Sequence, residues 1–379
     1  MESSRASFVR RMLRQVHLWI GLGLGLLFVP LGLSGAMLVF GTELDRFLEP
    51  SRYAVTSGGI ERTAGVYLAN AVAAAPGSRA VVLRWPLSTD MPVTVLLRSS
   101  GQTRVAYLDP PTGNILGIAG SSDSVVGFAH ALHANLMVDG LTGRQIVGWI
   151  GTGLLVMALS GAFIWWPRFG GMLRALRWQR GSNVSLNLHR TLGFWIAGPL
   201  AVMTLTGIYL SFPQQSRAVI AIFTELTPQA PRPMPGIEPI RQPTQDPQRV
   251  IELALQSGEG LSPVSLSPPT EQSKFWRVQV SKTGGVSQTV LVDDATSAIT
   301  STRQSTTGDA FTAWLRRVHE AKHHGAAWRL IAFLCGVAPA FLLVTGTIIW
   351  LSRRGPAALS LLRRGRRFRG FRASRPSNL

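Results

Sequence analysis

Four long apolar segments constrain the fold of this chain more than any other feature. They begin near Val16, Ile146, Leu188 and Leu330. The hydrocarbon core of a membrane is about 30 Å thick, and a helix needs roughly 20 apolar residues to cross it. The sequence therefore predicts an integral membrane protein with four transmembrane helices. No cleavage site follows the first segment, which ends at Phe40, so we expect it to be retained as an anchor.

Basic residues mark one side of the predicted membrane. Residues 1–16, residues 167–188 and the tail after Leu351 together hold 17 basic residues and one acidic residue. They carry +16 of the net charge of +19. Because basic loops stay in the cytoplasm, we expect both termini there, with residues 42–142 and 214–325 outside. The arginines flank helices without a nucleic-acid recognition motif, so nucleic-acid binding is a poor explanation of the charge.

The two outside segments share an order of predicted elements, in which a helix precedes alternating strands and an acidic turn. The first segment has a helix at Ala64–Ala75, strands at Ala80–Trp85, Thr94–Arg98 and Val105–Leu108, and a turn at Asp109–Gly113. The second has a helix at Gln248–Gln256, strands at Lys274–Val280 and Gln288–Val292, and a turn at Asp293–Thr296. Pro-rich stretches at Thr227–Pro247 and Ser262–Pro269 are expected to be extended linkers. The pattern predicts two small α+β domains.

The apolar segments repeat as well, which indicates an internal 2+2 duplication. In the first and third segments a histidine is followed 17 residues later by a Ser/Thr-Gly pair, Ser34-Gly35 or Thr206-Gly207. In the second and fourth segments the spacing from histidine to glycine is 28 and 27 residues, ending at Ser160-Gly161 and Thr345-Gly346. His17 is thus equivalent to His189, and His133 to His319.

Histidine placement predicts two metal sites, because all seven histidines lie at or just before the starts of the apolar segments. Helices that begin on the same side put His17 with His189 at the cytoplasmic face and His133 with His319 at the outer face. Two imidazoles from facing helices can ligate one haem from both sides, an arrangement suited to electron transfer. The only cysteine is Cys335 and no C-x-x-C-H motif occurs, so two b-type haems per chain are expected.

The remaining histidines and the small residues leave alternatives open. His130, His323 and His324 are alternate ligands, propionate donors or substrate contacts. Seventeen residues of helix span roughly 26 Å, so Gly35 and Gly207 lie near the level of the opposite site, as porphyrin clearances or as packing notches.

Other interpretations of these motifs are weaker. A zinc site from His319, Glu320, His323 and His324 would leave the two cytoplasmic-side histidines without a role. For any single histidine, the alternative to metal ligation is an ordinary solvated side chain at the membrane interface. The glycine run 21–25 resembles part of a dinucleotide loop, but it lies in an apolar helix, which favours packing. No hydrolase motif appears.

Several of these motifs resemble the PepSY-associated transmembrane proteins. They are R-x-x-H-x-W-x-G at Arg14–Gly21, H-x-x-L at His133–Leu136, H-R-x-x-G at His189–Gly193, and the D-P-x-T-G-type turn at Asp109–Gly113. Within that family the chain is similar to inner-membrane siderophore reductases of the ferrioxamine type from Gram-negative bacteria. The turn at Asp293–Ser297 lacks the proline and glycine of the pattern, which indicates drift in that copy.

The resemblance implies a haem-containing protein of the bacterial inner membrane that reduces ferric siderophores in the periplasm and releases Fe(II). It places the family's helix-entry histidines at His17, His133, His189 and His319, and makes the two outside domains PepSY-like. The expected organisation is 1–41 cytoplasmic N-terminus and first span, 42–142 periplasmic domain 1, 143–167 second span, 168–187 cytoplasmic loop, 188–213 third span, 214–325 periplasmic domain 2, 326–351 fourth span and 352–379 basic cytoplasmic tail.

The expected mechanism is stepwise electron transfer, because two haems divide a crossing of about 30 Å into shorter steps. The substrate would lie near the outer haem, with Phe311, Trp314, Arg316 and Arg317 as contacts. No flavin or nicotinamide fold is apparent, so the donor is a separate cytoplasmic reductase or a membrane quinol. The rival hypotheses are a non-enzymatic PepSY-type membrane regulator and a haem or metal carrier.

Overall fold

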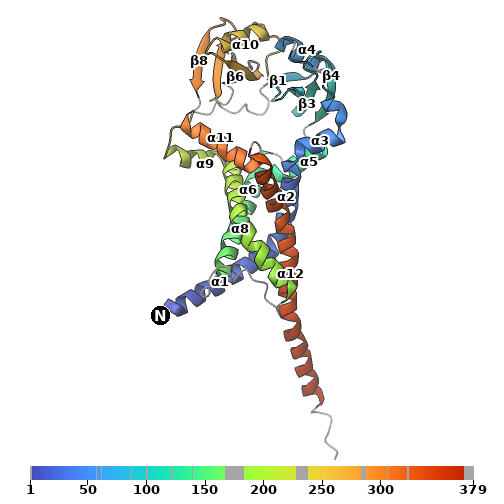
Figure 1. The fold of residues 1–379 in the computed structure, drawn as a ribbon, viewed down its shortest axis with the longest axis vertical. Coiled ribbons are helices and arrows are strands. Elements are labelled where there is room, and N and C mark those ends of the chain that lie inside the picture. Colours follow the sequence, from blue (N-terminus) through green and yellow to red (C-terminus); the bar gives the residue numbers. More distant parts are fainter. Residues whose placement is uncertain are drawn as a thin grey trace, which may run out of the picture. The chain divides into compact units, whose positions relative to one another are not determined.

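The computed structural model in Figure 1 describes residues 2–56, 58–60, 62–86, 88–99, 101–120, 123–138, 140–166, 183–227, 238–282, 287–304, 306–321 and 324–370. The expected cytoplasmic loop lies outside these residues up to position 182, and the first Pro-rich stretch lies outside them at 228–237. The chain forms two compact units. We call Met1–Val39, Leu132–Phe212 and Ala321–Leu379 the membrane unit, and Phe40–Ala131 and Pro213–Glu320 the sheet unit.

The membrane unit contains helices that are long and apolar enough to cross a bilayer. Within the described residues these are α6 (Gly140–Trp165), α8 (Val184–Ser211) and α12 (Gly325–Gly370). Helices α1 (Glu2–Gly23) and α2 (Gly25–Val39) meet at a bend of 66° and make a fourth span if the pair is one crossing. A glycine stands on each side of the bend, where helix propensity is low. Helix α12 continues past the expected end of the fourth span into the basic tail.

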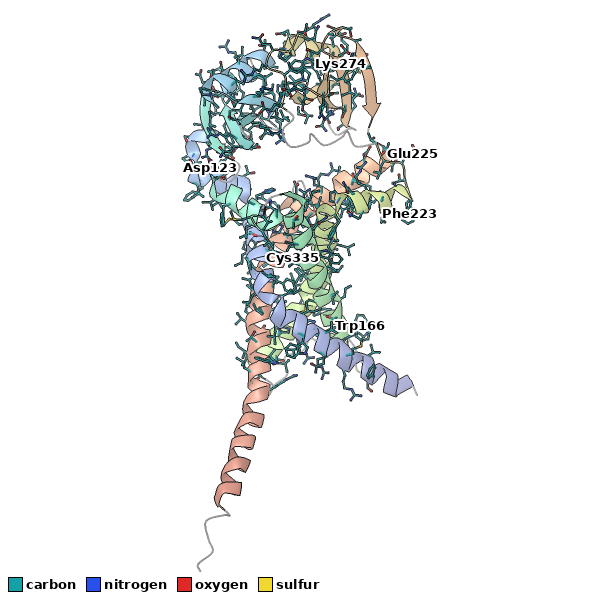
Figure 2. The ribbon with its side chains drawn as sticks, turned by 180° about the vertical axis from the view of Figure 1, so that it is seen from behind. Asp123, Trp166, Phe223, Glu225, Lys274 and Cys335 are labelled. Carbon is teal, nitrogen blue, oxygen red and sulfur yellow. The ribbon has the colours of Figure 1, made fainter. Side chains whose placement is uncertain are left out.

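Small residues allow a close helix contact in this unit. Helix α2 runs along α12, which also contacts α8 (Figure 1). A Cβ on Gly32 would lie 2.3 Å from the carbonyl oxygen of Gly336, and one on Gly336 would lie 2.5 Å from that of Gly32. The two backbones therefore touch, as in small-residue crossings of membrane helices. Cys335, beside this crossing, is buried in the bundle (Figure 2).

Two glycines of the run in the first span also pack against other helices. A Cβ on Gly25 would lie 2.6 Å from Leu343 Cδ1, and one on Gly21 would lie 3.0 Å from Met157 Cε. These contacts agree with a packing role.

The sheet unit is built on one antiparallel sheet of eight strands in the order β4-β3-β2-β1-β5-β6-β7-β8. The strands are β1 Arg79–Arg84, β2 Val93–Ser99, β3 Gln102–Leu108, β4 Ile115–Gly120, β5 Leu261–Ser267, β6 Phe275–Lys282, β7 Ser287–Asp293 and β8 Ile299–Gln304. Helices α4 (Ala64–Ala74) and α10 (Pro247–Leu255) contact these strands and each other (Figure 1). The alternating strand residues bury one face under the helices, in a core that includes Tyr67, Leu83, Leu108, Val250, Leu266, Trp276, Val278 and Val290.

The two outside segments meet through β1 and β5. These strands pair at Leu83 with Leu266 and at Arg84 with Ser265, so both segments share one sheet and one core. This differs from the two separate domains expected from the sequence. The interpretation of Ser262–Pro269 as a linker is wrong, because strand β5 occupies most of it. Its Pro263 stands next to a register shift, a position where a sheet tolerates proline.

Short helices that the sequence analysis does not predict connect the spans to the sheet. They are α3 (Gly41–Leu48), the 3₁₀ turn η1 (Pro50–Tyr53), α5 (Val125–Asn135), α9 (Pro213–Ala221) and α11 (Thr307–Glu320).

The acidic turns at the ends of β3 and β7 have the same backbone geometry. The N–H of Gly113 donates to the carbonyl of Asp109 at 2.8 Å, and that of Ser297 donates to the carbonyl of Asp293 at 3.0 Å. The donor residue is left-handed in both turns, with φ of +74° at Gly113 and +60° at Ser297. The second copy thus keeps the turn after losing the glycine.

Candidate functional site

The membrane unit brings His17 of α1 and His189 of α8 together. Their ring centres are 6.5 Å apart and the ring planes are nearly perpendicular, at 84°. Both side chains are half-buried. This proximity agrees with the equal depth that the repeat predicts for the two residues. Their role as ligands stays a prediction.

A hydroxyl on a neighbouring helix contacts each ring. His17 Nδ1 lies 2.9 Å from Ser160 Oγ of α6, and His189 Nδ1 lies 3.0 Å from Thr345 Oγ1 of α12. The residue after each hydroxyl is a glycine. The sequence analysis identified these Ser/Thr-Gly pairs as a repeat but gave them no partner.

These glycines leave room for the imidazoles. A Cβ on Gly161 would lie 3.1 Å from His17 Cε1, and one on Gly346 would lie 3.3 Å from His189 Cε1. A larger residue would push each ring away from its hydroxyl. The recurrence of a Ser/Thr-Gly pair in the second and fourth segments was the sequence signal available for this contact.

Both histidines line a cavity of about 1000 Å³ between α1, α2, α6, α8 and α12. That volume is at the upper end of the range for small-molecule sites. The lining is largely apolar and includes Trp165, which stacks on Phe194 with ring centres 3.9 Å apart. The cavity suits a large, flat and mostly apolar ligand.

Four arginines line the same cavity, and none of the described lining residues is acidic. Arg10 donates to the carbonyl of Trp166 at 3.1 Å. In the part of the chain that the structure describes, Arg14, Arg190 and Arg353 have no hydrogen-bond or ion-pair partner. Guanidinium groups are well suited to carboxylates, so the cavity favours an anionic ligand. The grouping of these arginines was not predicted, because the basic residues were used for membrane orientation alone.

His133, in α5, also has an oxygen atom of another helix beside its Nδ1. Its Nδ1 lies 2.8 Å from the carbonyl oxygen of Leu31 in α2. A Cβ on Gly35 would lie 2.7 Å from His133 Cε1. Gly35 therefore does lie at the level of this histidine, as the helix spacing predicts.

The other histidines are distributed over both units. His133 belongs to the membrane unit and His319, in α11, to the sheet unit, so their predicted pairing stays a prediction. His130 and His324 are exposed. His323 lies outside the described residues. Among those residues no group of three or more His, Cys, Asp or Glu side chains could hold a metal ion, and the zinc alternative, which needs His323, is not tested.

The predicted substrate contacts lie on α11. Phe311 and Trp314 stack with ring centres 5.9 Å apart and are 44% and 45% exposed. Arg316 lies 3.7 Å from Glu320, and Arg317 is exposed. The helix thus presents aromatic and basic side chains to solvent, and their role as substrate contacts stays a prediction.

The family comparison agrees with this architecture. The model of one protein family, described as the PepSY-associated TM region, matches residues 14–353. A search among curated proteins found no match. The matched range holds the candidate spans and both histidines of the cavity. The chain therefore belongs to the PepSY-associated transmembrane family.

Proposed function

We propose that this membrane protein is a haem b ferric-siderophore reductase that passes electrons across the bacterial inner membrane and releases Fe(II) in the periplasm. The observation that carries the proposal is the pair of equivalent histidines, His17 and His189, in a cavity inside a helix bundle. A membrane regulator would have no use for such a pair.

The residues of the cavity fit a haem. Two imidazole nitrogens that share one metal, each about 2 Å from it, put the ring centres roughly 6 Å apart. The observed separation is 6.5 Å. Apolar and aromatic walls suit a porphyrin, and Arg14, Arg190 and Arg353 suit its carboxylates. When bound, the group would supply one-electron transfer.

The chain's own residues have clear tasks in this proposal. His17 and His189 would hold the haem iron, whose chemistry there would be one-electron transfer. The apolar walls exclude water. Ferric siderophores hold Fe(III) through hard oxygen donors that bind Fe(II) less tightly, so reduction is sufficient for release and no proton-transfer residue is needed.

The outer end would hold the second haem between His133 and His319, with His130, His323 and His324 as auxiliary residues. The substrate would contact the sheet unit through Phe311, Trp314, Arg316 and Arg317. Electrons would come from a separate cytoplasmic reductase or a membrane quinol.

Absorption spectra of the purified protein test the proposal. We expect a red preparation with a Soret band, α and β bands that sharpen on dithionite reduction, and two haems per chain. His17→Ala or His189→Ala should remove one haem and spare the other, and His133→Ala or His319→Ala should do the reverse. Thr204→Val is the control and should keep both haems, because the Thr204 hydroxyl bonds the Leu200 carbonyl within α8.

A second assay separates reductase from carrier. Reduced protein is mixed with ferric siderophore and an Fe(II) chelator, and we expect coloured Fe(II) complex with reoxidation of the haem bands. Haem that stays reduced would favour the carrier. A colourless protein that still functions in cells would refute the haem site.

A further inference from the structure

The hydroxyls beside the histidine pair determine more than packing. Each accepts or donates one hydrogen bond at an imidazole Nδ1, and a hydroxyl has only one hydrogen. Where that hydrogen goes decides which nitrogen of the imidazole carries a proton.

Backbone carbonyls take the hydroxyl hydrogen. Thr345 Oγ1 lies 2.9 Å from the carbonyl oxygen of Phe341, one turn earlier in α12. Ser160 Oγ lies 3.3 Å from the carbonyl oxygen of Met157 in α6. Ser and Thr within helices commonly donate to the preceding turn in this way. The oxygen then has only lone pairs to offer the imidazole, so Nδ1 must be the donor.

His133 supports the same assignment independently. Its Nδ1 faces the carbonyl oxygen of Leu31 at 2.8 Å, and a carbonyl can only accept. Nδ1 of His133 therefore carries the hydrogen. Three of the four histidines proposed as ligands have an acceptor at Nδ1.

We propose that Ser160 and Thr345 are positioning residues that hold His17 and His189 in the Nδ1–H form and aim both Nε2 lone pairs at one shared metal. This inference rests on the proposed function for the identity of the ligand. A ligating imidazole needs an unprotonated nitrogen, and a hydrogen bond at the other nitrogen fixes the ring and raises its basicity. Gly161 and Gly346 permit the short approach of each ring.

Nitrogen NMR of the haem-free full-length protein tests the tautomer without any ligand. With ¹⁵N-labelled histidine, His17 and His189 should show protonated Nδ1 and unprotonated Nε2, assigned through His17→Gln and His189→Gln. Ser160→Ala and Thr345→Val should move the matching histidine toward the Nε2–H form that a neutral histidine side chain prefers in water. Wild-type rings already in the Nε2–H form would overturn the proposal, whether or not the protein binds haem.

Haem titration and potentiometry test the consequence. Ser160→Ala and Thr345→Val should each weaken binding at this site about 10- to 100-fold and shift its reduction potential. Ser160→Thr and Thr345→Ser keep a hydroxyl at each position and should retain the wild-type affinity and reduction potential. The matched control is Thr204→Val, since the Thr204 hydroxyl bonds the Leu200 carbonyl within α8 at 2.8 Å.

The outcomes separate the two proposals. Unchanged affinity and potential in both hydroxyl variants would refute the positioning role while the haem site stands. A wild-type protein without haem would refute the proposed function, and the NMR experiment would still decide the tautomer.

Discussion

The two halves of the chain build equivalent contacts from different residues. At the histidine pair, a serine hydroxyl lies 2.9 Å from Nδ1 of His17 in one half, and a threonine hydroxyl lies 3.0 Å from Nδ1 of His189 in the other. In the sheet, the turn after β3 uses a left-handed glycine, and the turn after β7 uses a left-handed serine. The comparison shows that the duplicated copies preserve hydrogen-bond geometry where their sequences have changed.

In the first half, a single carboxylate both closes its turn and fixes an incoming segment. Asp109 accepts from Thr112 Oγ1 at 2.6 Å within the turn. It also accepts from the N–H of Thr56 at 2.9 Å and from its hydroxyl at 2.8 Å. Burial alone would raise the pKa of Asp109, but these hydrogen bonds outweigh it and hold the pKa below its usual value.

In the second half, two carboxylates divide these tasks. Asp293 accepts from the N–H of Thr296 at 3.0 Å within the turn, and Asp294 accepts from the N–H of Thr244 at 2.9 Å. The ion pair with Lys274 lowers the pKa of Asp293. Burial alone would raise the pKa of Asp294, but hydrogen bonds from the segment at Thr244 outweigh burial and lower that pKa. The extra aspartate, which replaces the proline of the first copy, makes this division possible.

Gly336→Ala should cause the largest loss of stability among substitutions at equivalent positions of the two halves. The new Cβ would lie 2.5 Å from a backbone oxygen of α2, so the helices must separate, at a cost of about 3 kcal/mol. The repeat makes Gly151 the equivalent residue, and a Cβ there would lie 3.5 Å from Ile208, an ordinary contact. Thermal unfolding in detergent should show a large loss for Gly336→Ala and little change for Gly151→Ala. Equal losses would mean that the crossing is not tighter in one half.

Asp109→Asn should destabilise the sheet by about 2 kcal/mol, because one change removes charged hydrogen bonds to two residues. Asp294→Asn should cost about as much, since the Asp294 carboxylate accepts from the N–H groups of Thr244 and Gln245 and from Trp276 Nε1.

The acid limb of the stability curve checks the roles of both carboxylates. Because the folded pKa values of Asp109 and Asp294 are lowered, their stabilisation is complete above about pH 4 and is lost as the pH falls through the folded values. Urea unfolding between pH 2.5 and 7 should show a shallower acid decline in each Asn variant. An unchanged decline in Asp109→Asn would contradict the role of its carboxylate.

Neutralising the arginines of the cavity should weaken haem binding at the histidine pair. Arg14→Gln and Arg190→Gln should each weaken haem binding about tenfold, the loss of roughly 1.4 kcal/mol expected for a charged hydrogen bond. Arg10→Gln should matter less, because Arg10 already donates to the Trp166 carbonyl. Haem titration of the wild type and the three variants measures the effect. Equal affinities throughout would exclude the arginines from ligand binding.

Exchanging the turn residues should give the smallest effects, with opposite signs. Ser297→Gly should stabilise the protein by about 1 kcal/mol, because glycine adopts positive φ without strain. Gly113→Ala should destabilise it by about the same amount, and its Cβ would also lie 3.1 Å from Val66. Chemical unfolding of both variants measures the pair, and changes of the same sign would contradict this explanation.

Sequence patterns predicted elements whose signal is local. Alternating β-branched residues identified β1, β2, β3, β6 and β7, and the repeat spacing predicted the approach of His17 and His189. Strand β5 was not predicted because Pro263 is an unusual residue inside a strand. The glycine-rich β4 and the polar β8 carry weak strand signals.

Features that depend on tertiary structure could not be predicted in this way. The pairing of β1 with β5 joins residues about 180 positions apart, and nothing local to either strand specifies its partner. The gathering of Arg14, Arg190 and Arg353 around one cavity depends on three helices at once.

The pairing of β1 with β5 and of His17 with His189 joins each residue or strand to its own copy. That is the self-complementary contact of a twofold-symmetric dimer. A polypeptide of half this length would form the same histidine pair only by self-association, at a rate set by its concentration in the membrane. Within one chain the encounter is intramolecular, and the two copies need not be identical, so that serine and threonine, or one aspartate and two, can stand at equivalent positions.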